Sequence, residues 1–146
     1  MTDTIGFILS DTARLLRRRF DARARSFGVT RAQWQVLLSL SRNEGINQVG
    51  LADRLEVENI TLCRMIDRLS DAGLVERRAD PAYRRVWRLH LTPAAQQMIE
   101  KLRHVADEVV EDALSGLGTR ERSQLGDLLE SVRSNLSARP PAAAQA

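Results

Sequence analysis

The sequence predicts a mainly α-helical protein with one small β-hairpin, arranged as a winged helix-turn-helix with additional helices at both ends. Three observations support this prediction. Apolar residues recur at three- and four-residue steps along most of the 146 residues, as they do in amphipathic helices. Two of these helical stretches are joined by a link of only three residues, 56–58. After Gly73 the pattern changes to two short strands around an Asp80–Pro81 turn, which together predict a hairpin.

Local signals predict the bounds of the first two helices. The first helix is expected over residues 4–26, with Gly28 ending it. Thr30 and Gln33 have the spacing of a capping box, in which each side chain bonds the backbone N–H of the other residue. The second helix is therefore expected over residues 31–42.

The middle of the chain contains the helix pair and the hairpin. Helices are expected near residues 47–55 and 58–72, and Gly73 supplies a C-terminal stop for the second of them. The strands of the hairpin are expected over residues 74–78 and 86–91. Because two helices with so short a link cross steeply, the second helix is able to enter the major groove of a duplex.

Two further helices are expected after the hairpin. Thr92 should cap a long helix that begins at Pro93 and runs to about residue 114. Thr119 should cap a last helix that runs to about residue 136. The Ala/Pro-rich tail, residues 137–146, is expected to be disordered.

We expect one domain over residues 1–136, because this length suits a single core. Within it, residues 30–92 should form a DNA-binding lobe, and residues 4–29 and 93–136 should form dimerisation helices. The apolar stripes of these outer helices offer more apolar surface than so small a lobe can cover. A homodimer is therefore expected, in preference to a monomer that buries both stripes in its own core.

Composition and charge exclude several classes of protein. The hydrophobic fraction of 43% indicates a globular chain, and no run approaches the roughly 18 apolar residues of a membrane span. The N-terminus lacks the basic residues of a secretory signal, so we expect a cytoplasmic protein. Residues 1–92 contain 16 arginines and 11 acidic residues, a formal charge of +5, while residues 93–146 carry −2. Arginine suits the binding of phosphates and guanine edges.

The second helix of the pair is expected to have an apolar face and a polar face. Leu62, Ile66 and Leu69 should point inward. The outward or flanking residues carry groups that read base edges or bind phosphates, and they are Asn59, Thr61, Arg64 and Arg68. At the hairpin tip, Arg84 and Arg85 are placed to enter a narrow minor groove. Such helix pairs also occur in bundles that bind nothing, and an Arg-rich hairpin is often only a solvated surface; the combination in this order favours DNA binding.

The same residues resemble the MarR family. The resemblance lies in the runs 61–69 (TLCRMIDRL) and 72–77 (AGLVER), in the hairpin run 80–85 (DPAYRR), and in 89–92 (LHLT). The pair Leu51–Ala52 resembles the SlyA-like branch of that family. The resemblance covers roughly residues 5–136. It implies a homodimer built from the terminal helices, one winged helix-turn-helix per subunit, and control by small aromatic anions.

Two residues depart from the family pattern. Tyr83 stands where the family usually has an acidic residue that helps to shape the wing, and Cys63 stands where the family usually has Ser or Thr. We interpret Cys63 as a small residue beside the core of its helix rather than as a redox sensor. Oxidation-sensing relatives carry their reactive cysteine in the first helix, where this chain has none. One cysteine also excludes an internal disulfide.

Candidate ligands are fewer. Trp34 is a candidate to line an effector pocket, or else is plain core; Arg17 either meets an effector carboxylate, or lies in solvent or in an intersubunit ion pair. His90 and His104 are candidate metal ligands, but no cysteine or acidic cluster accompanies them at matching spacing, so no metal is expected. No cofactor is expected either.

The sequence therefore predicts a sequence-specific DNA-binding regulator, interpreted as a homodimeric repressor on an inverted-repeat operator that a small aromatic carboxylate releases. The alternative is a winged-helix protein-interaction module without DNA binding, against which Arg64, Arg68, Arg84 and Arg85 argue. An enzyme is not expected, because the sequence contains no recognisable nucleophile–base pair, phosphate loop or metal cluster.

Overall fold

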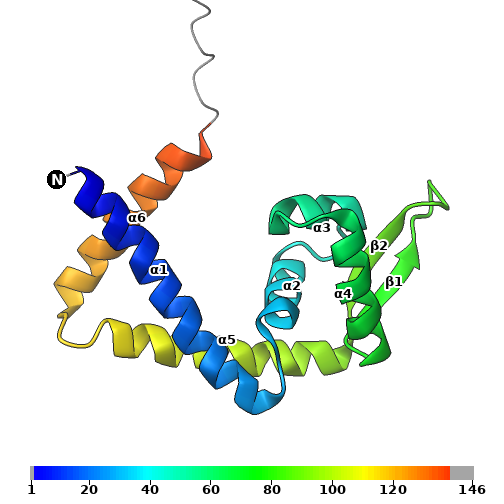
Figure 1. Cartoon of the computed structure of the whole chain (residues 1–146), viewed down its shortest axis with the longest axis horizontal. Coiled ribbons are helices and arrows are strands. Elements are labelled where there is room, and N and C mark those ends of the chain that lie inside the picture. The colour runs from blue at the N-terminus through cyan, green and yellow to red at the C-terminus, as the bar shows by residue number, and fades with distance from the viewer. Residues whose placement is uncertain (1, 139–146) are drawn as a thin grey trace, which may run out of the picture. The chain divides into compact units, whose positions relative to one another are not determined.

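The computed structural model describes residues 2–138, which form helices and a two-stranded hairpin (Figure 1). The chain divides into two compact units, Met1–Val110 and Glu111–Ala146. The elements follow in the order α1 (Thr2–Ala24), a 3-10 turn (Arg25–Phe27), α2 (Arg31–Arg42), α3 (Gln48–Leu55), α4 (Asn59–Asp71), β1 (Val75–Ala79), β2 (Trp87–Leu91), α5 (Pro93–Ala113) and α6 (Thr119–Ser137). The predicted fold class is thereby confirmed. No helix in the described part of the chain is long and apolar enough to cross a membrane.

Local capping explains why α2 begins where the sequence predicts. The Thr30 hydroxyl accepts a hydrogen bond from the Gln33 N–H at 3.3 Å, and the Thr30 N–H donates to Gln33 Oε1 at 3.0 Å. Just before it, Gly28 has φ +76°, a left-handed conformation that glycine adopts without steric cost. The expected first helix is slightly wrong at its end, because α1 stops at Ala24 and the chain tightens into the 3-10 turn.

The start of the last helix also differs from the expectation. Gly118, not Thr119, is the N-cap residue, because its backbone is already extended and Thr119 is the first helical residue. The Glu121 side chain accepts the Gly118 N–H at 3.0 Å, which satisfies a donor at this helix end. By contrast, Thr92 caps α5 as expected, its hydroxyl accepting the Ala95 N–H at 3.2 Å.

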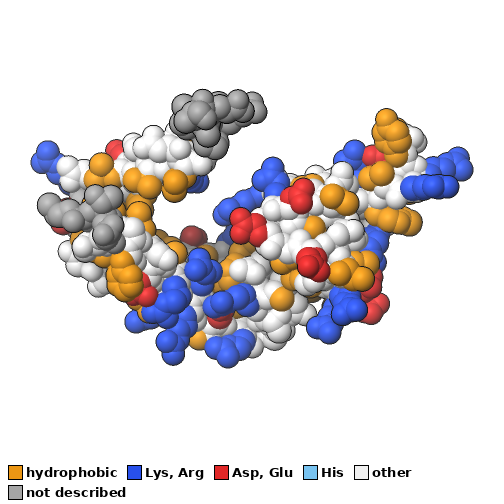
Figure 2. All heavy atoms as spheres, turned by 45° about the horizontal axis from the view of Figure 1, so that its top comes forward, with side chains coloured by type: hydrophobic (Ala, Val, Ile, Leu, Met, Phe, Trp, Pro, Cys, Tyr) orange, Lys and Arg blue, Asp and Glu red, His pale blue; other side chains and the backbone are white. Residues whose placement is uncertain are grey.

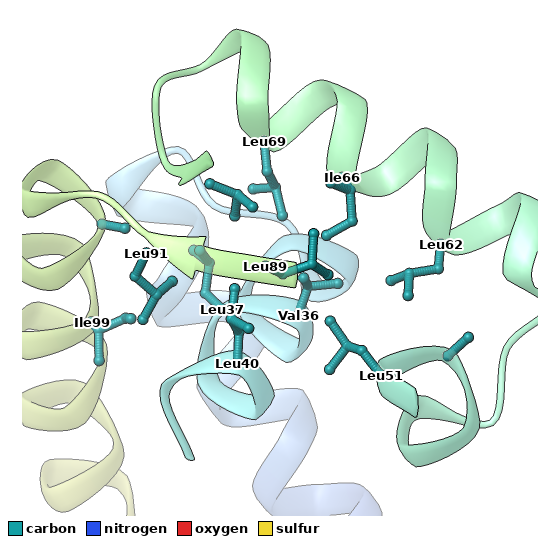
Figure 3. Close-up of a cluster of buried hydrophobic side chains, with 13 residues drawn as sticks. Val36, Leu37, Leu40, Leu51, Leu62, Ile66, Leu69, Leu89, Leu91 and Ile99 are labelled. Carbon is teal, nitrogen blue, oxygen red and sulfur yellow. The ribbon is translucent and has the colours of Figure 1, made fainter. Parts of the chain in front are cut away.

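A core of aliphatic side chains holds the helix pair, the hairpin and the start of α5 together (Figure 3). Its fully buried members include Val36, Leu37, Leu40, Leu51, Leu62, Ile66, Leu69, Leu89 and Ile99. The inward orientation expected for Leu62, Ile66 and Leu69 on α4 is confirmed. Because three turns of α4 are anchored from below, its opposite face has a fixed orientation toward solvent.

A second, smaller core joins α1 to α5. Phe20 and Ala24 of α1 are buried with Leu102, Val105 and Val109 of α5. The Phe20 ring meets the Trp34 indole edge-on, with the ring centroids 4.7 Å apart, which is a favourable aromatic geometry. Ion pairs between Arg23 and Glu108 and between Arg31 and Asp21 flank this cluster.

In the second unit, the loop between α5 and α6 is held by one arginine. Arg122 donates to both carboxylate oxygens of Glu111 at 2.8 and 2.9 Å and to the carbonyls of Leu114 and Leu117 at 3.1 and 3.0 Å. Helix α6 itself has no buried residue among those described. Its exposed apolar residues are Leu125, Leu128, Leu129, Val132 and Leu136. Most of the tail expected to be disordered, residues 139–146, lies outside the described residues.

Candidate nucleic-acid interface

The outer face of α4 carries the polar residues singled out in the sequence. Thr61, Arg64 and Arg68 are exposed and lie on the side of the helix that faces away from the core. Neither arginine makes a hydrogen bond or an ion pair within residues 4–138. Two guanidinium groups one helical turn apart are therefore available to an external partner.

Asn59, at the start of α4, has a partner on the preceding helix. Its side-chain oxygen accepts a hydrogen bond from Gln48 Nε2 at 3.3 Å, which links the first turns of α3 and α4. The turn between the two helices is closed by Glu56, whose φ of +54° is left-handed. The Asn59 amide nitrogen remains directed to solvent chemistry, so only half of this side chain's hydrogen-bonding capacity is used inside the protein.

The hairpin is fastened to the helix pair at its base. The strands β1 and β2 are antiparallel, with Val75 opposite Leu91 and Ala79 opposite Trp87. The segment before α3 also pairs with β2, because the Gly45 N–H donates to the Leu89 carbonyl at 2.9 Å and the Leu89 N–H donates to the Ile46 carbonyl at 3.0 Å. The wing is consequently continuous with the lobe rather than a loose arm.

Three of the five wing arginines have partners inside the protein. Arg77 donates to Asp67 Oδ1 at 2.6 Å and to the Cys63 carbonyl at 3.3 Å, which ties β1 to α4. Arg78 pairs with Glu76 at 3.2 Å. Arg88 of β2 bonds Asp80, as described below. These side chains are positioned by their partners and are less available to a ligand than the sequence alone indicates.

Arg84 and Arg85 behave differently. Both are exposed in the turn between the strands, and within the described chain neither forms a side-chain hydrogen bond or ion pair. Figure 2 shows Lys and Arg side chains gathered at the outer end of the hairpin. The tip thus presents two unpaired positive charges next to the exposed arginines of α4, which packs against β1.

Asp80 shapes the wing tip, a role that the sequence reasoning missed. Its side chain is only 5% exposed and accepts the backbone N–H groups of Ala82 and Tyr83 at 2.7 and 3.2 Å. It also accepts Arg88 Nε at 2.6 Å, and Arg88 Nη1 donates to the Gly45 carbonyl at 2.8 Å. These hydrogen bonds, first that of the Ala82 N–H and then that of Arg88, lower the pKa of the Asp80 carboxyl.

The Tyr83 departure therefore leaves the wing turn formed. Its backbone N–H is held by Asp80, while its side chain is 70% exposed. An aspartate followed by proline and a small residue is a turn signal in which the carboxylate bonds the backbone two residues on. That signal was available in the sequence, whereas the Arg88 contact joins residues 8 and 43 positions apart and was not.

The predicted effector residues lie apart from one another in their contacts. Trp34 is half-buried and its Nε1–H donates to Asp21 Oδ1 at 2.6 Å, whereas Arg17 is exposed on α1. Burial raises the pKa of the Asp21 carboxyl, but the hydrogen bonds from Arg31 and Trp34 outweigh it, so the net shift is downward. A surface hollow of about 640 Å³ lies between the end of α1 and α5, and neither Trp34 nor Arg17 lines it.

The other singled-out residues have ordinary surroundings. His90 and His104 each lie 3.9 Å from one carboxylate, that of Glu44 and of Glu108. Among the residues described, no group of three His, Cys, Asp or Glu side chains is placed to hold a metal ion. Cys63 is half-buried, with its sulfur 3.9 Å from Arg77 Nη2.

A helix pair with a short link, followed by a hairpin anchored to it, defines a winged helix-turn-helix. Comparison with known proteins agrees. The sequence model of the MarR family matches residues 29–87. The solved structure of the transcriptional regulator PA3341 is 34% identical, covers 92% of this chain and 99% of its own, and superposes with a TM-score of 0.77. The chain belongs to the MarR family of transcriptional regulators.

Two further solved structures are informative. A MarR transcriptional regulator from Methanosarcina mazei is 29% identical over 91% of this chain and 96% of its own, with a TM-score of 0.80. A mutant of MarR from E. coli, solved in complex with operator DNA, is 26% identical over 88% of this chain and 93% of its own, with a TM-score of 0.72. The likeness extends beyond the helix pair and hairpin to nearly the whole chain.

Proposed function

We propose that this MarR-family chain binds double-stranded DNA sequence-specifically and regulates transcription, with no catalytic activity of its own. The observation that carries the proposal is a set of four exposed arginines without partners in the described structure, on two elements that pack together: Arg64 and Arg68 on α4, and Arg84 and Arg85 at the wing tip. A duplex offers guanine edges to such groups in its major groove and phosphates along both strands. The operator complex of the E. coli relative supports this assignment.

The two pairs of arginines have different roles in this proposal. Arg64 lies nearest the centre of the exposed face of α4 and reads a base edge in the major groove, while Arg68, one turn later, holds a phosphate. Asn59 and Thr61 lie in the first turn of α4 and contact the duplex beside Arg64. Arg84 and Arg85 enter the adjacent minor groove, where a narrow width attracts arginine.

The protein acts as a homodimeric repressor on an inverted repeat. Support comes from apolar side chains left exposed on α1, including Ile5, Phe7 and Ile8, and from those on α6. In this proposal residues 4–29 and 93–136 form the dimer interface, and 30–92 form the DNA-binding lobe. Light scattering should give twice 16.4 kDa, and the half-sites should lie about 10 base pairs apart, centre to centre. A monomer that binds an operator tightly would contradict the dimer.

A small aromatic carboxylate releases the dimer from DNA in this proposal, with Trp34 and Arg17 as contacts. Because the Trp34 N–H is already bonded to Asp21, the indole would contribute its ring face and Arg17 the charge. Benzoate should raise the melting temperature and weaken DNA binding, and Arg17→Ala should reduce both effects. An unchanged melting temperature and DNA affinity with benzoate would remove the effector from the proposal.

Within the family we assign the chain to the SlyA-like branch, on the Leu51–Ala52 pair. The competing function is a winged-helix module that binds another protein and no DNA. The exposed arginines of α4 and of the wing tip separate the two, since a module that has left DNA needs no unpaired cations there.

Selection from a pool of randomised duplexes tests the proposed function. The protein should enrich an inverted repeat, and its affinity for the selected duplex should fall steeply with salt, while a scrambled duplex binds weakly. The absence of any enriched sequence, together with equal affinity for selected and scrambled duplexes, would favour the protein-interaction module.

A further inference from the structure

Ile60 is an apolar residue in the exposed first turn of α4. Its side chain is 63% exposed and belongs to neither core cluster. Single exposed apolar residues are common on proteins, so exposure alone explains nothing. Its position is informative: residues four apart lie on one face of a helix, and Ile60 therefore lies one turn before Arg64 on the face opposite Leu62, Ile66 and Leu69.

The polar side chains around Ile60 are partly occupied within the protein. Asn59, its neighbour toward α3, has its side-chain oxygen bonded to Gln48. Asp67, the acid two turns further along the helix, is paired with Arg77. The outward face of the first two turns thus presents a branched aliphatic group beside the unpaired guanidinium of Arg64.

Among the four bases of DNA, only thymine places an apolar group in the major groove, its C5-methyl. The N-terminal residues of a recognition helix contact base edges there. We propose that Ile60 is a specificity-determining residue that packs against the C5-methyl group of one thymine in each half-site. The inference rests on the proposed DNA binding, and it adds an apolar selection to the hydrogen-bonding selection made by Arg64.

Replacement of thymine by deoxyuridine tests the contact directly, because it removes the methyl group and keeps every hydrogen-bonding atom. In the selected duplex each thymine is replaced in turn, symmetrically in both half-sites, and the dissociation constant is measured. The wild-type protein should lose affinity about threefold to fivefold per half-site at one thymine position, the effect of exposing one methyl group. Every other thymine should be indifferent to the change.

The variant Ile60→Ala completes a double-mutant cycle. It should bind the thymine duplex more weakly than the wild type and no longer distinguish thymine from deoxyuridine at that position. Val49→Ala is the matched control, since Val49 is an apolar residue of α3 with a similar exposure of 59%; it should keep the full discrimination. Both side chains are exposed, so neither variant should lower the melting temperature, and circular dichroism checks this.

Three outcomes overturn the inference. A wild-type protein that binds its selected duplex but tolerates deoxyuridine everywhere makes no methyl contact, and the proposed function survives. An Ile60→Ala protein that still distinguishes the two bases assigns the contact to another residue. Failure to select any duplex removes the proposed function and this inference together.

Discussion

The arginines at the base of the wing and those at its tip differ in what they bind. Arg77 and Arg88 are engaged with Asp67, Cys63, Asp80 and Gly45, whereas Arg84 and Arg85 make no contact with the described protein. The same residue type therefore stabilises the wing at one end and is available to a partner at the other. A count of basic residues in this hairpin overstates the charge available to DNA.

The largest effect expected from this comparison is on DNA binding at the tip. The double substitution Arg84→Ala and Arg85→Ala removes two phosphate contacts, so affinity for the selected duplex should fall roughly thirtyfold near physiological salt, and the salt slope should decrease by about 2. The melting temperature should stay unchanged because both side chains are exposed and unpaired. Fluorescence anisotropy at several salt concentrations measures both quantities; full affinity in this variant would show that the tip is idle.

The two unpaired arginines of α4 should separate by role. Arg64→Ala should cost about 1–3 kcal/mol on the selected duplex and relax base preference at one position per half-site. Arg68→Ala should weaken selected and scrambled duplexes alike and lower the salt slope by about 1. Binding isotherms on both duplexes distinguish these results, and a uniform loss in Arg64→Ala would reassign that side chain to a phosphate.

The engaged arginines should affect stability first. Arg88→Ala leaves the buried Asp80 carboxylate without its charged donor and frees the Gly45 carbonyl, so the melting temperature should fall by a few degrees. Arg78→Ala is the matched control on β1, because Arg78 pairs only with the exposed Glu76 and its loss should change little. Thermal unfolding followed by circular dichroism compares the two; equal melting temperatures would remove the distinction between base and surface arginines.

The smallest effect is a dependence on acid. The pKa of Asp80 in the folded protein lies below the ordinary value of 3.8, so its ionised form stabilises the fold above that value, and the stabilisation is lost as the pH falls through the lowered pKa. Asp80→Asn should therefore be less stable than the wild type near neutral pH. The difference in unfolding free energy should shrink in acid, as urea titrations at several pH values would record; a constant difference would contradict the assigned shift.

Elements governed by neighbouring residues could be predicted from the sequence. The bounds of α2 follow from the Thr30 and Gln33 capping box, and the buried face of α4 follows from the spacing of Leu62, Ile66 and Leu69. Even the family's regular features, the helix pair and the hairpin, arise from short-range patterns. Prediction was less accurate where two caps compete, as at Gly118 and Thr119.

The wing was predicted as a hairpin but not as a fastened one. Its hydrogen bonds from Arg77 to Cys63 and from Arg88 to Gly45 join residues 14 and 43 positions apart, and no periodicity in a single sequence records such pairs. The sequence therefore identified which arginines exist in the wing. Only the three-dimensional contacts separate Arg84 and Arg85, as candidates for DNA contact, from Arg77 and Arg88.

The Asp80–Arg88–Gly45 contacts have a consequence for the thermodynamics of association. Ordering the backbone of one residue costs about 1–2 kcal/mol in conformational entropy. Because these contacts order the wing turn when the chain folds, that entropy is already lost before a duplex arrives, and the turn docks as a preorganised element. Calorimetry should accordingly show an association heat capacity that follows the apolar area buried at the duplex, without the additional negative contribution of a segment that folds on binding.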